Sequence, residues 1–212
     1  MKLGRALGEG RSGTTADLVA VGLGNPGSDY EGSRHNLGAL AVRVLATRHH
    51  ARLRTERGTS CETVSVRDGG KLLVLAVPQT YMNESGMAVR PLAKRYLGAD
   101  PELAERLVIV HDELDLPPGT VRIKAGGGTA GHNGLRSIEA HLHRRDFLRV
   151  RIGIGKPPSR AHGVDHVLKR PTKAVKDLLD VSVEVAADAV EAILAEGVAA
   201  AMNRFNTRVE AE

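Results

Sequence analysis

The chain of 212 residues is 42% apolar and 26% charged, which suits one compact domain. Cys61 is the only cysteine, so a disulfide scaffold is excluded and a reducing compartment is expected. The longest apolar runs, such as residues 72–77, are far shorter than the roughly 20 residues of a membrane span. Residues 1–15 lack the apolar region of a secretory signal. We therefore expect a cytoplasmic protein with no membrane partner.

The charge balance favours an anionic partner. Thirty Lys and Arg residues against 25 Asp and Glu residues give a net charge of +5, and nucleic acid is the first candidate. The chain has no Trp, only three Tyr and only two Phe, whereas proteins that bind single strands stack bases on several aromatic side chains. If the protein binds nucleic acid, we expect it to recognise phosphates and shape rather than splayed bases.

Short apolar runs predict buried strands at residues 18–23, 72–77 and 107–110. Residues 121–124 and 149–154 alternate polar and apolar side chains, which predicts half-exposed strands. Residues 1–16 are rich in Gly, Arg and Ser without periodicity, so we expect a flexible tail. A single catalytic domain of residues 17–212 is expected to follow it.

Apolar residues at helical spacing predict the helices. One helix is expected to bury an apolar face made of Leu37, Leu40, Ala41, Val44 and Leu45, with Ser33 as its N-cap. Further helices are expected from Ser85 despite Pro91, from Leu135, and once or twice after Pro171.

The alternation of buried strands with helices predicts an α/β fold whose mostly parallel sheet is covered on both faces. Ligands of such sheets bind beyond the carboxyl ends of the strands. Asn25, Asn83 and Asp112 each follow one of the three apolar runs, and His35 opens the helix after the first run. We expect these four side chains to converge on one crevice.

His35 and Asp112 are the candidates for acid–base chemistry. An uncharged imidazole that a carboxylate orients is what a general base for water needs. Asp112 follows an apolar strand, so its backbone is expected to be rigid, whereas Glu113 and Asp115 lie further into the turn. The alternatives are that His35 faces solvent or caps its helix, and that Asp112 only caps the turn.

Two glycine-rich segments are candidates for ligand binding. Residues 22–27 match G-x-G-x-x-G, but a loop follows them and residues 41–52 contain no acidic residue, so a tight turn is favoured over a dinucleotide site. Residues 124–134 contain glycines whose backbone N–H groups can reach a phosphate or a carbonyl oxygen. The alternative is a flexible lid without a ligand, although His132 and Asn133 at its end favour a function.

Several chemistries lack their motifs. The chain has no G-x-S-x-G elbow, Cys61 has no nearby His, and the spacing of His162 and His166 is not that of an H-E-x-x-H zinc site. We therefore expect neither a metal nor a cofactor. Water attack assisted by a base, with amides positioning the substrate, remains.

Five segments carry a family resemblance: VGLGNPGSDYEGSRHNLG (21–38), PQTYMNESGMAV (78–89), VHDELDLPPGTVRIKAGGGTAGHNGLRSI (110–138), RVRIGIGKP (149–157) and AMNRFN (201–206). Together they resemble the bacterial-type peptidyl-tRNA hydrolase family. The resemblance implies a single α/β domain around a twisted mixed sheet with helices on both faces. It also implies hydrolysis of the ester between a peptide and tRNA, which recycles tRNA from abandoned translation, by a monomer whose partner is peptidyl-tRNA.

The resemblance assigns roles to polar residues of the crevice. It implies that His35 is the catalytic base, that Asp112 orients it, and that Asn133 fixes the water or the developing oxyanion. Asn25 and Asn83 look like the amides that hold the peptide end and the 3′ terminus of the tRNA.

Further matched residues look like substrate contacts. Met82 is similar to a methionine that lines the family's crevice, and Tyr30 to a tyrosine beside the acceptor end. Lys124 and Arg151 resemble a pair that clamps the 5′-phosphate, and His132 is placed with the substrate-binding residues.

The chain departs from the family pattern at three positions. Ser33 stands where Thr is commoner, Glu84 where an apolar or basic residue is usual, and His166 where an aromatic residue is usual. Ser33 keeps the hydroxyl group, whereas Glu84 could weaken the approach of phosphate.

Two rival functions fit parts of the sequence. A non-catalytic RNA-binding module explains the charge and the glycine-rich segments but gives no reason for His35 with Asp112. A nucleotide-dependent oxidoreductase needs the acidic residue that is missing after the first glycine-rich segment. Cleavage of a related RNA-linked ester also stays open.

Overall fold

The computed structural model describes residues 15–98, 103–157, 159 and 162–207. Its centre is a seven-stranded sheet of order β2-β3-β4-β1-β5-β7-β6. The four strands β4, β1, β5 and β7 run parallel, while β2, β3 and β6 pair antiparallel at the two edges. The strands are β1 (Leu18–Gly22), β2 (Arg54–Glu56), β3 (Cys61–Asp68), β4 (Lys71–Pro78), β5 (Leu107–Glu113), β6 (Val121–Ala125) and β7 (Leu148–Gly153). The predicted mixed, mostly parallel sheet is confirmed.

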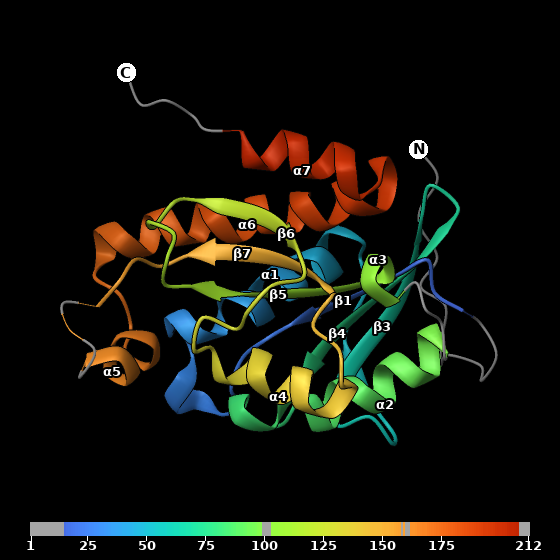
Figure 1. Cartoon of the computed structure of the whole chain (residues 1–212), viewed down its shortest axis with the longest axis horizontal. Helices are drawn as coiled ribbons and strands as arrows, with labels where there is room; N and C mark the ends of the chain where they lie inside the picture. The colour runs from blue at the N-terminus through green and yellow to red at the C-terminus, as the bar shows by residue number, and fades with distance from the viewer. Residues whose placement is uncertain (1–14, 99–102, 158, 160–161, 208–212) are drawn as a thin grey trace.

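Helices cover both faces of the sheet (Figure 1). One face carries α1 (Leu37–Arg48), α6 (Lys173–Glu196) and α7 (Val198–Asn206), and the other carries α2 (Ser85–Leu97) and α4 (Asn133–Leu142). The short helices are η1 (Ser28–Tyr30), η2 (Arg34–Asn36), η3 (Met82–Glu84), α3 (Leu103–Arg106) and α5 (Gly163–Leu168). Each face of the sheet has its own buried apolar cluster, so two cores sandwich the strands.

A close approach of helix to sheet fixes the start of α1. A Cβ atom added to Gly38 would lie 2.1 Å from the carbonyl oxygen of Val110, and one added to Gly22 would lie 2.2 Å from that of Gly38. Only glycine allows backbones to come this close. As a result, η2 lies directly at the carboxyl ends of β1 and β5, where the sequence predicts the crevice.

Most predicted elements are confirmed, but three local expectations are wrong. β7 is almost fully buried rather than half-exposed, because it lies between β5 and β6 and both of its faces are covered. Leu40 is 42% exposed, because it lies on the side of α1 that faces away from the core. The Ser33 side chain makes no capping hydrogen bond, and α1 begins only at Leu37, after the 3-10 turn η2.

The ends of the chain refine the predicted boundaries. Of the predicted tail 1–16, residues 1–14 lie outside the described residues, and Ala16 is buried with its N–H donating to the Tyr96 carbonyl at 2.8 Å. At the other end, the Asn206 side chain accepts from the Ile123 N–H at 2.9 Å and donates to the Ile123 carbonyl at 2.8 Å. The edge strand β6 is therefore covered by α7. Within the described ranges, no helix combines the length and hydropathy needed to cross a bilayer.

Candidate active site

Two imidazoles meet one buried carboxylate at the carboxyl end of β5. Nδ1 of His35 lies 2.9 Å from Oδ1 of Asp112, and Nε2 of His132 lies 3.1 Å from the same oxygen. The three residues come from η2, from the last part of β5 and from the residue before α4. His35 is 8% exposed and Asp112 is 3% exposed, so the alternatives of a solvent-facing His35 and a turn-capping Asp112 do not describe their positions.

The hydrogen bonds indicate the tautomer of each ring. His132 is the N-cap of α4, and its Nδ1 accepts from the N–H groups of Gly134 at 3.1 Å and Leu135 at 3.4 Å. Its proton is therefore on Nε2, which donates to Asp112. In the same way, Nδ1–H of His35 donates to the carboxylate, which leaves the lone pair of its Nε2 for a reacting molecule.

The Asp112 carboxyl is held in its ionised form. Burial by itself raises the pKa of Asp112, but the neighbouring His35 and His132 outweigh burial and hold the pKa well below its usual range. The fixed negative charge can stabilise an imidazolium that forms beside it during a reaction.

The same three groups have the spacing of metal ligands. One ligand atom from each of His35, Asp112 and His132 lies within 4.8 Å of the others. Each imidazole nitrogen that faces the carboxylate carries a proton in the tautomers described above, so a cation there would have to displace both protons. The arrangement therefore suits proton transfer better than metal binding.

His111 was not singled out from the sequence, yet it lies against this cluster. Its ring packs edge-on against that of His132, with centroids 5.0 Å apart, and its Nδ1 donates to the Asp112 carbonyl at 2.7 Å. Burial lowers the pKa of His111 to about 3, and the nearby His132 adds to this effect. His111 is therefore an uncharged part of the wall behind His132. Its place next to Asp112 in an apolar strand was the available signal.

Asn25 joins the loop after β1 to η3. Its Oδ1 accepts from the Met82 N–H at 2.7 Å, which leaves the Nδ2 group as a donor for a ligand. The backbone of Asn25 is itself fixed, since its N–H donates to Asn36 Oδ1 at 2.8 Å and its carbonyl accepts from Asn36 Nδ2 at 3.0 Å. Asn36 was missed by the sequence reasoning. The Met82 side chain is only 4% exposed and packs tightly against Gly134.

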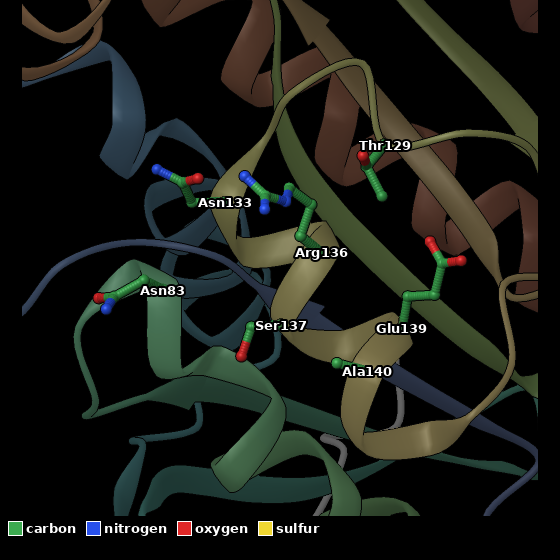
Figure 2. A pocket seen from close by; sticks show the side chains of 7 residues that line it. All are labelled: Asn83, Thr129, Asn133, Arg136, Ser137, Glu139 and Ala140. Atoms are coloured by element: carbon green, nitrogen blue, oxygen red, sulfur yellow. The ribbon is translucent and has the colours of Figure 1, made fainter.

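A cleft of about 590 Å³ is lined by Asn83 and Asn133, the residues that follow Met82 and His132 in the chain, and not by His35 or Asp112 themselves. Its lining consists of Asn83, Thr129, Asn133, Arg136, Ser137, Glu139 and Ala140. Figure 2 shows Asn83 and Asn133 at one end of the cleft, on η3 and at the start of α4, and Thr129 and Glu139 at the other end. Amide donors from two elements thus share one concave surface, as expected for a site that binds carbonyl groups.

Cationic residues share one face of the β6–β7 pair. Lys124 lies opposite Arg149 and Arg122 lies opposite Arg151 in the antiparallel register, so all four side chains leave the same face. Lys124 is exposed, and Nη1 of Arg151 lies 3.8 Å from a carboxylate oxygen of Glu113. The predicted pair Lys124 and Arg151 therefore lies on a common surface without direct contact with the His35 cluster.

Tyr30 lies at the outer edge of the site. Its ring packs edge-on against that of Tyr81, with centroids 6.3 Å apart. Tyr81 is 55% exposed, and it directly precedes Met82 and Asn83. The structure thus packs a half-buried Tyr30 against an exposed Tyr81 next to the start of η3.

The comparison with protein families agrees with this geometry. The family model described as peptidyl-tRNA hydrolase matches residues 19–212. The chain belongs to the peptidyl-tRNA hydrolase family. A peptidyl-tRNA hydrolase from Cutibacterium acnes is 44% identical over 199 residues, covering 89% of this chain and 98% of its own length. One from Nocardia farcinica is 46% identical over 193 residues, covering 91% and 98%.

Solved peptidyl-tRNA hydrolase structures share the fold. A crystal structure of a peptidyl-tRNA hydrolase in complex with N-propanol aligns with a TM-score of 0.83 at 39% identity, covering 96% of this chain and all of that one. The enzyme from Acinetobacter baumannii aligns with a TM-score of 0.82 at 38% identity, covering 94% and 98%. The single α/β domain is therefore the fold of peptidyl-tRNA hydrolases.

The structure shows the surroundings of the three residues that depart from the peptidyl-tRNA hydrolase pattern. Nε2 of His166 donates to the Gly155 carbonyl at 3.0 Å, and the His166 carbonyl accepts from Arg34 at 3.0 Å, so α5 is tied to η2 beside His35. Glu84 is exposed at the start of α2. Ser33 is buried, and its hydroxyl has no hydrogen-bond partner among the described residues.

Proposed function

We propose that this peptidyl-tRNA hydrolase cleaves the ester of peptidyl-tRNA by attack of a water molecule that His35 deprotonates. The observation that carries the proposal is the buried 2.9 Å hydrogen bond between His35 and Asp112. It orients the imidazole at the carboxyl end of a parallel sheet so that Nδ1 faces the carboxylate and Nε2 is left to take a proton from water. The family and its named relatives supply the substrate.

The reaction then has two steps. Nε2 of His35 takes a proton from water while the water oxygen attacks the ester carbonyl, and Asp112 stabilises the imidazolium that forms. In the second step the tetrahedral intermediate collapses, the bond to the ribose oxygen breaks, and the imidazolium returns its proton to that oxygen. The products are tRNA with a free ribose hydroxyl and the peptide acid, which loses its proton to solvent and becomes the carboxylate.

The amides are proposed to hold the carbonyl groups. Nδ2 of Asn25 is free to donate to the substrate because its Oδ1 is taken by Met82. Asn83, which follows Met82 in η3, and Asn133 line one end of the cleft (Figure 2). An amide that donates to the developing oxyanion contributes roughly 3 kcal/mol in other hydrolases, and Asn133 is the candidate for this role.

Binding of the tRNA is proposed to depend on the cationic face of β6 and β7. Lys124 and Arg151 would hold phosphate, while Tyr30 lies at the acceptor end of the substrate. Because phosphate contacts release counterions, KM for peptidyl-tRNA should rise with salt. Lys124→Ala should raise KM more than it lowers kcat, and the reverse pattern would place Lys124 in the chemical step.

The deciding experiment compares wild type, His35→Ala and His162→Ala for release of tRNA from purified peptidyl-tRNA. His162 is an exposed histidine outside the His35 cluster, so its variant controls for the loss of an imidazole. We expect His35→Ala to lose a factor of roughly 10²–10⁴ in kcat while it still binds the substrate, because that is the usual contribution of a general base. Wild-type turnover by His35→Ala would refute the assignment, and binding without cleavage by wild type would favour an RNA-binding module. The monomeric state and the cytoplasmic location remain predictions.

A further inference from the structure

Arg149 of β7 is an arginine whose side chain is buried under the glycine-rich loop of residues 126–131. The whole residue is 2% exposed, and its guanidinium stacks over the Phe147 ring at 5.0 Å from the ring centroid. Nη2 donates to the Gly127 carbonyl at 2.6 Å, and Nη1 donates to the Gly128 carbonyl. The two arms of one planar group therefore hold two consecutive peptide units.

A buried arginine is usually paired with a carboxylate, because desolvation of its charge is costly. Among the described residues, no carboxylate oxygen lies within 4 Å of the Arg149 guanidinium, and burial lowers the pKa of Arg149. The acceptors are instead backbone carbonyls of the loop. Glu139 and Glu113 favour the charge from a distance, but the hydrogen bonds that compensate its burial come from the loop and are lost if the loop changes its conformation.

Arg149 supplies the hydrogen bonds that hold the middle of the loop of residues 126–131. Gly126, Gly127, Ala130 and Gly131 have positive φ angles, so the backbone follows a path with little intrinsic rigidity. The Gly126 N–H donates to the Phe147 carbonyl at 3.1 Å at the start of the loop, and the His132 N–H donates to the Thr129 carbonyl at 2.8 Å at its end. Between these two bonds, the guanidinium of Arg149 holds the carbonyls of residues 127 and 128.

We propose that Arg149 is a positioning residue for the hydrolysis of peptidyl-tRNA: by holding the carbonyls of Gly127 and Gly128, it fixes the loop that places Thr129 and Asn133 on the cleft and His132 beside Asp112. This inference rests on the proposed function of the site. His132 reaches Asp112 from the end of this loop, and Thr129 and Asn133 line the cleft (Figure 2).

The rival role for Arg149 is a third phosphate contact beside Lys124 and Arg151, which share its face of the β6–β7 pair. The two roles differ in accessibility. Lys124 is exposed, whereas Arg149 is buried and has both terminal nitrogens in use within the protein. A phosphate could reach Arg149 only if the loop opened, so the geometry favours positioning.

Steady-state cleavage of peptidyl-tRNA at several KCl concentrations separates the two roles. Arg149→Met keeps the length of the stem and removes the donors, Arg149→Lys keeps the charge without the two-armed fork, and Lys124→Met is the matched control. We expect Arg149→Met to lower kcat by roughly 10²-fold, the effect of a misplacement of about 1 Å, with the salt slope of log KM unchanged. Lys124→Met should instead raise KM and reduce that slope by about one.

Arg149→Lys should recover only part of kcat, because one ammonium group cannot reproduce two parallel hydrogen bonds. It also serves as the readout if Arg149→Met does not fold. A smaller salt slope with wild-type kcat in Arg149→Met, or a wild-type kcat in Arg149→Lys, would overturn the proposal and make Arg149 a phosphate contact.

Hydrogen exchange supplies a readout that needs no substrate. The amides of Gly126 and His132 are hydrogen-bonded to Phe147 at 3.1 Å and Thr129 at 2.8 Å, so both are expected to be protected in the wild type. We expect both to exchange at least tenfold faster in the Arg149 variants than in the wild type. Unchanged exchange in the Arg149 variants would refute the anchoring role. Failure of the wild type to cleave peptidyl-tRNA would refute the proposed function, whereas the exchange rates would still test the anchoring role of Arg149.

Discussion

Replacement of Asp112 by Asn tests how much the buried carboxylate contributes to the reaction. The asparagine side chain has nearly the same shape and can still accept from the imidazoles, but it carries no charge. The carboxylate oxygen lies 2.9 Å from Nδ1 of His35. Because the charge of an imidazolium is spread over its ring, we take an effective separation of about 4 Å. At an effective dielectric constant of 20, the attraction between the two charges is then roughly 4 kcal/mol. Loss of that stabilisation in the transition state corresponds to roughly 10³-fold in kcat.

The assay is single-turnover release of tRNA from peptidyl-tRNA, with KM measured in parallel. KM should stay near the wild-type value, because Asp112 is 3% exposed and lies behind His35 and His132 rather than on the cleft surface. Asp146→Asn is the matched control, since the Asp146 side chain is 49% exposed and pairs with Arg144 away from the His35 cluster. A kcat for Asp112→Asn within tenfold of the wild type would show that the carboxylate does not stabilise an imidazolium.

Three further predictions concern the scaffold. Burial lowers the pKa of His111 from its usual value of 6.5 to about 3. Between pH 3 and pH 6.5 the unfolded chain therefore binds more protons than the folded chain, and the free energy of unfolding should fall as the pH drops through this range. In urea unfolding, this pH dependence should be weaker in His111→Asn by up to about 1.4 kcal/mol per pH unit. Burial raises the pKa of Cys61 to about 12, so iodoacetamide at pH 8 should label Cys61 only when the chain unfolds, and fast labelling of the native protein would contradict its burial. A Cβ at Gly38 would lie 2.1 Å from the Val110 carbonyl oxygen. Gly38→Ala should therefore lower the free energy of unfolding by roughly 1–3 kcal/mol in thermal or urea unfolding, and it should lower kcat by displacing η2. An unchanged stability would show that α1 can move away from the sheet.

Two of the three wrong local expectations, those for β7 and Leu40, share one cause. Alternating side chains in β7 predicted a half-exposed strand, but the arginine at position 149 is buried because the loop of residues 126–131 folds over it and its donors find carbonyl acceptors there. Leu40 was predicted to be buried from its spacing, although α1 presents it to solvent. In both cases local periodicity predicted the element correctly but contained no information about what packs against it.

The sequence by itself determined the elements, since apolar runs and helical spacing are local properties, and its motifs pointed to the correct family. Only the tertiary structure decided that His35 and Asp112, 77 positions apart in the chain, share a 2.9 Å hydrogen bond, and that His132 donates to the same oxygen. It also decided the tautomers of both rings and the burial of His111 and Arg149. Distances between distant residues depend on how the helices pack on the sheet, and here that packing is set by the contact of Gly38 with the end of β5.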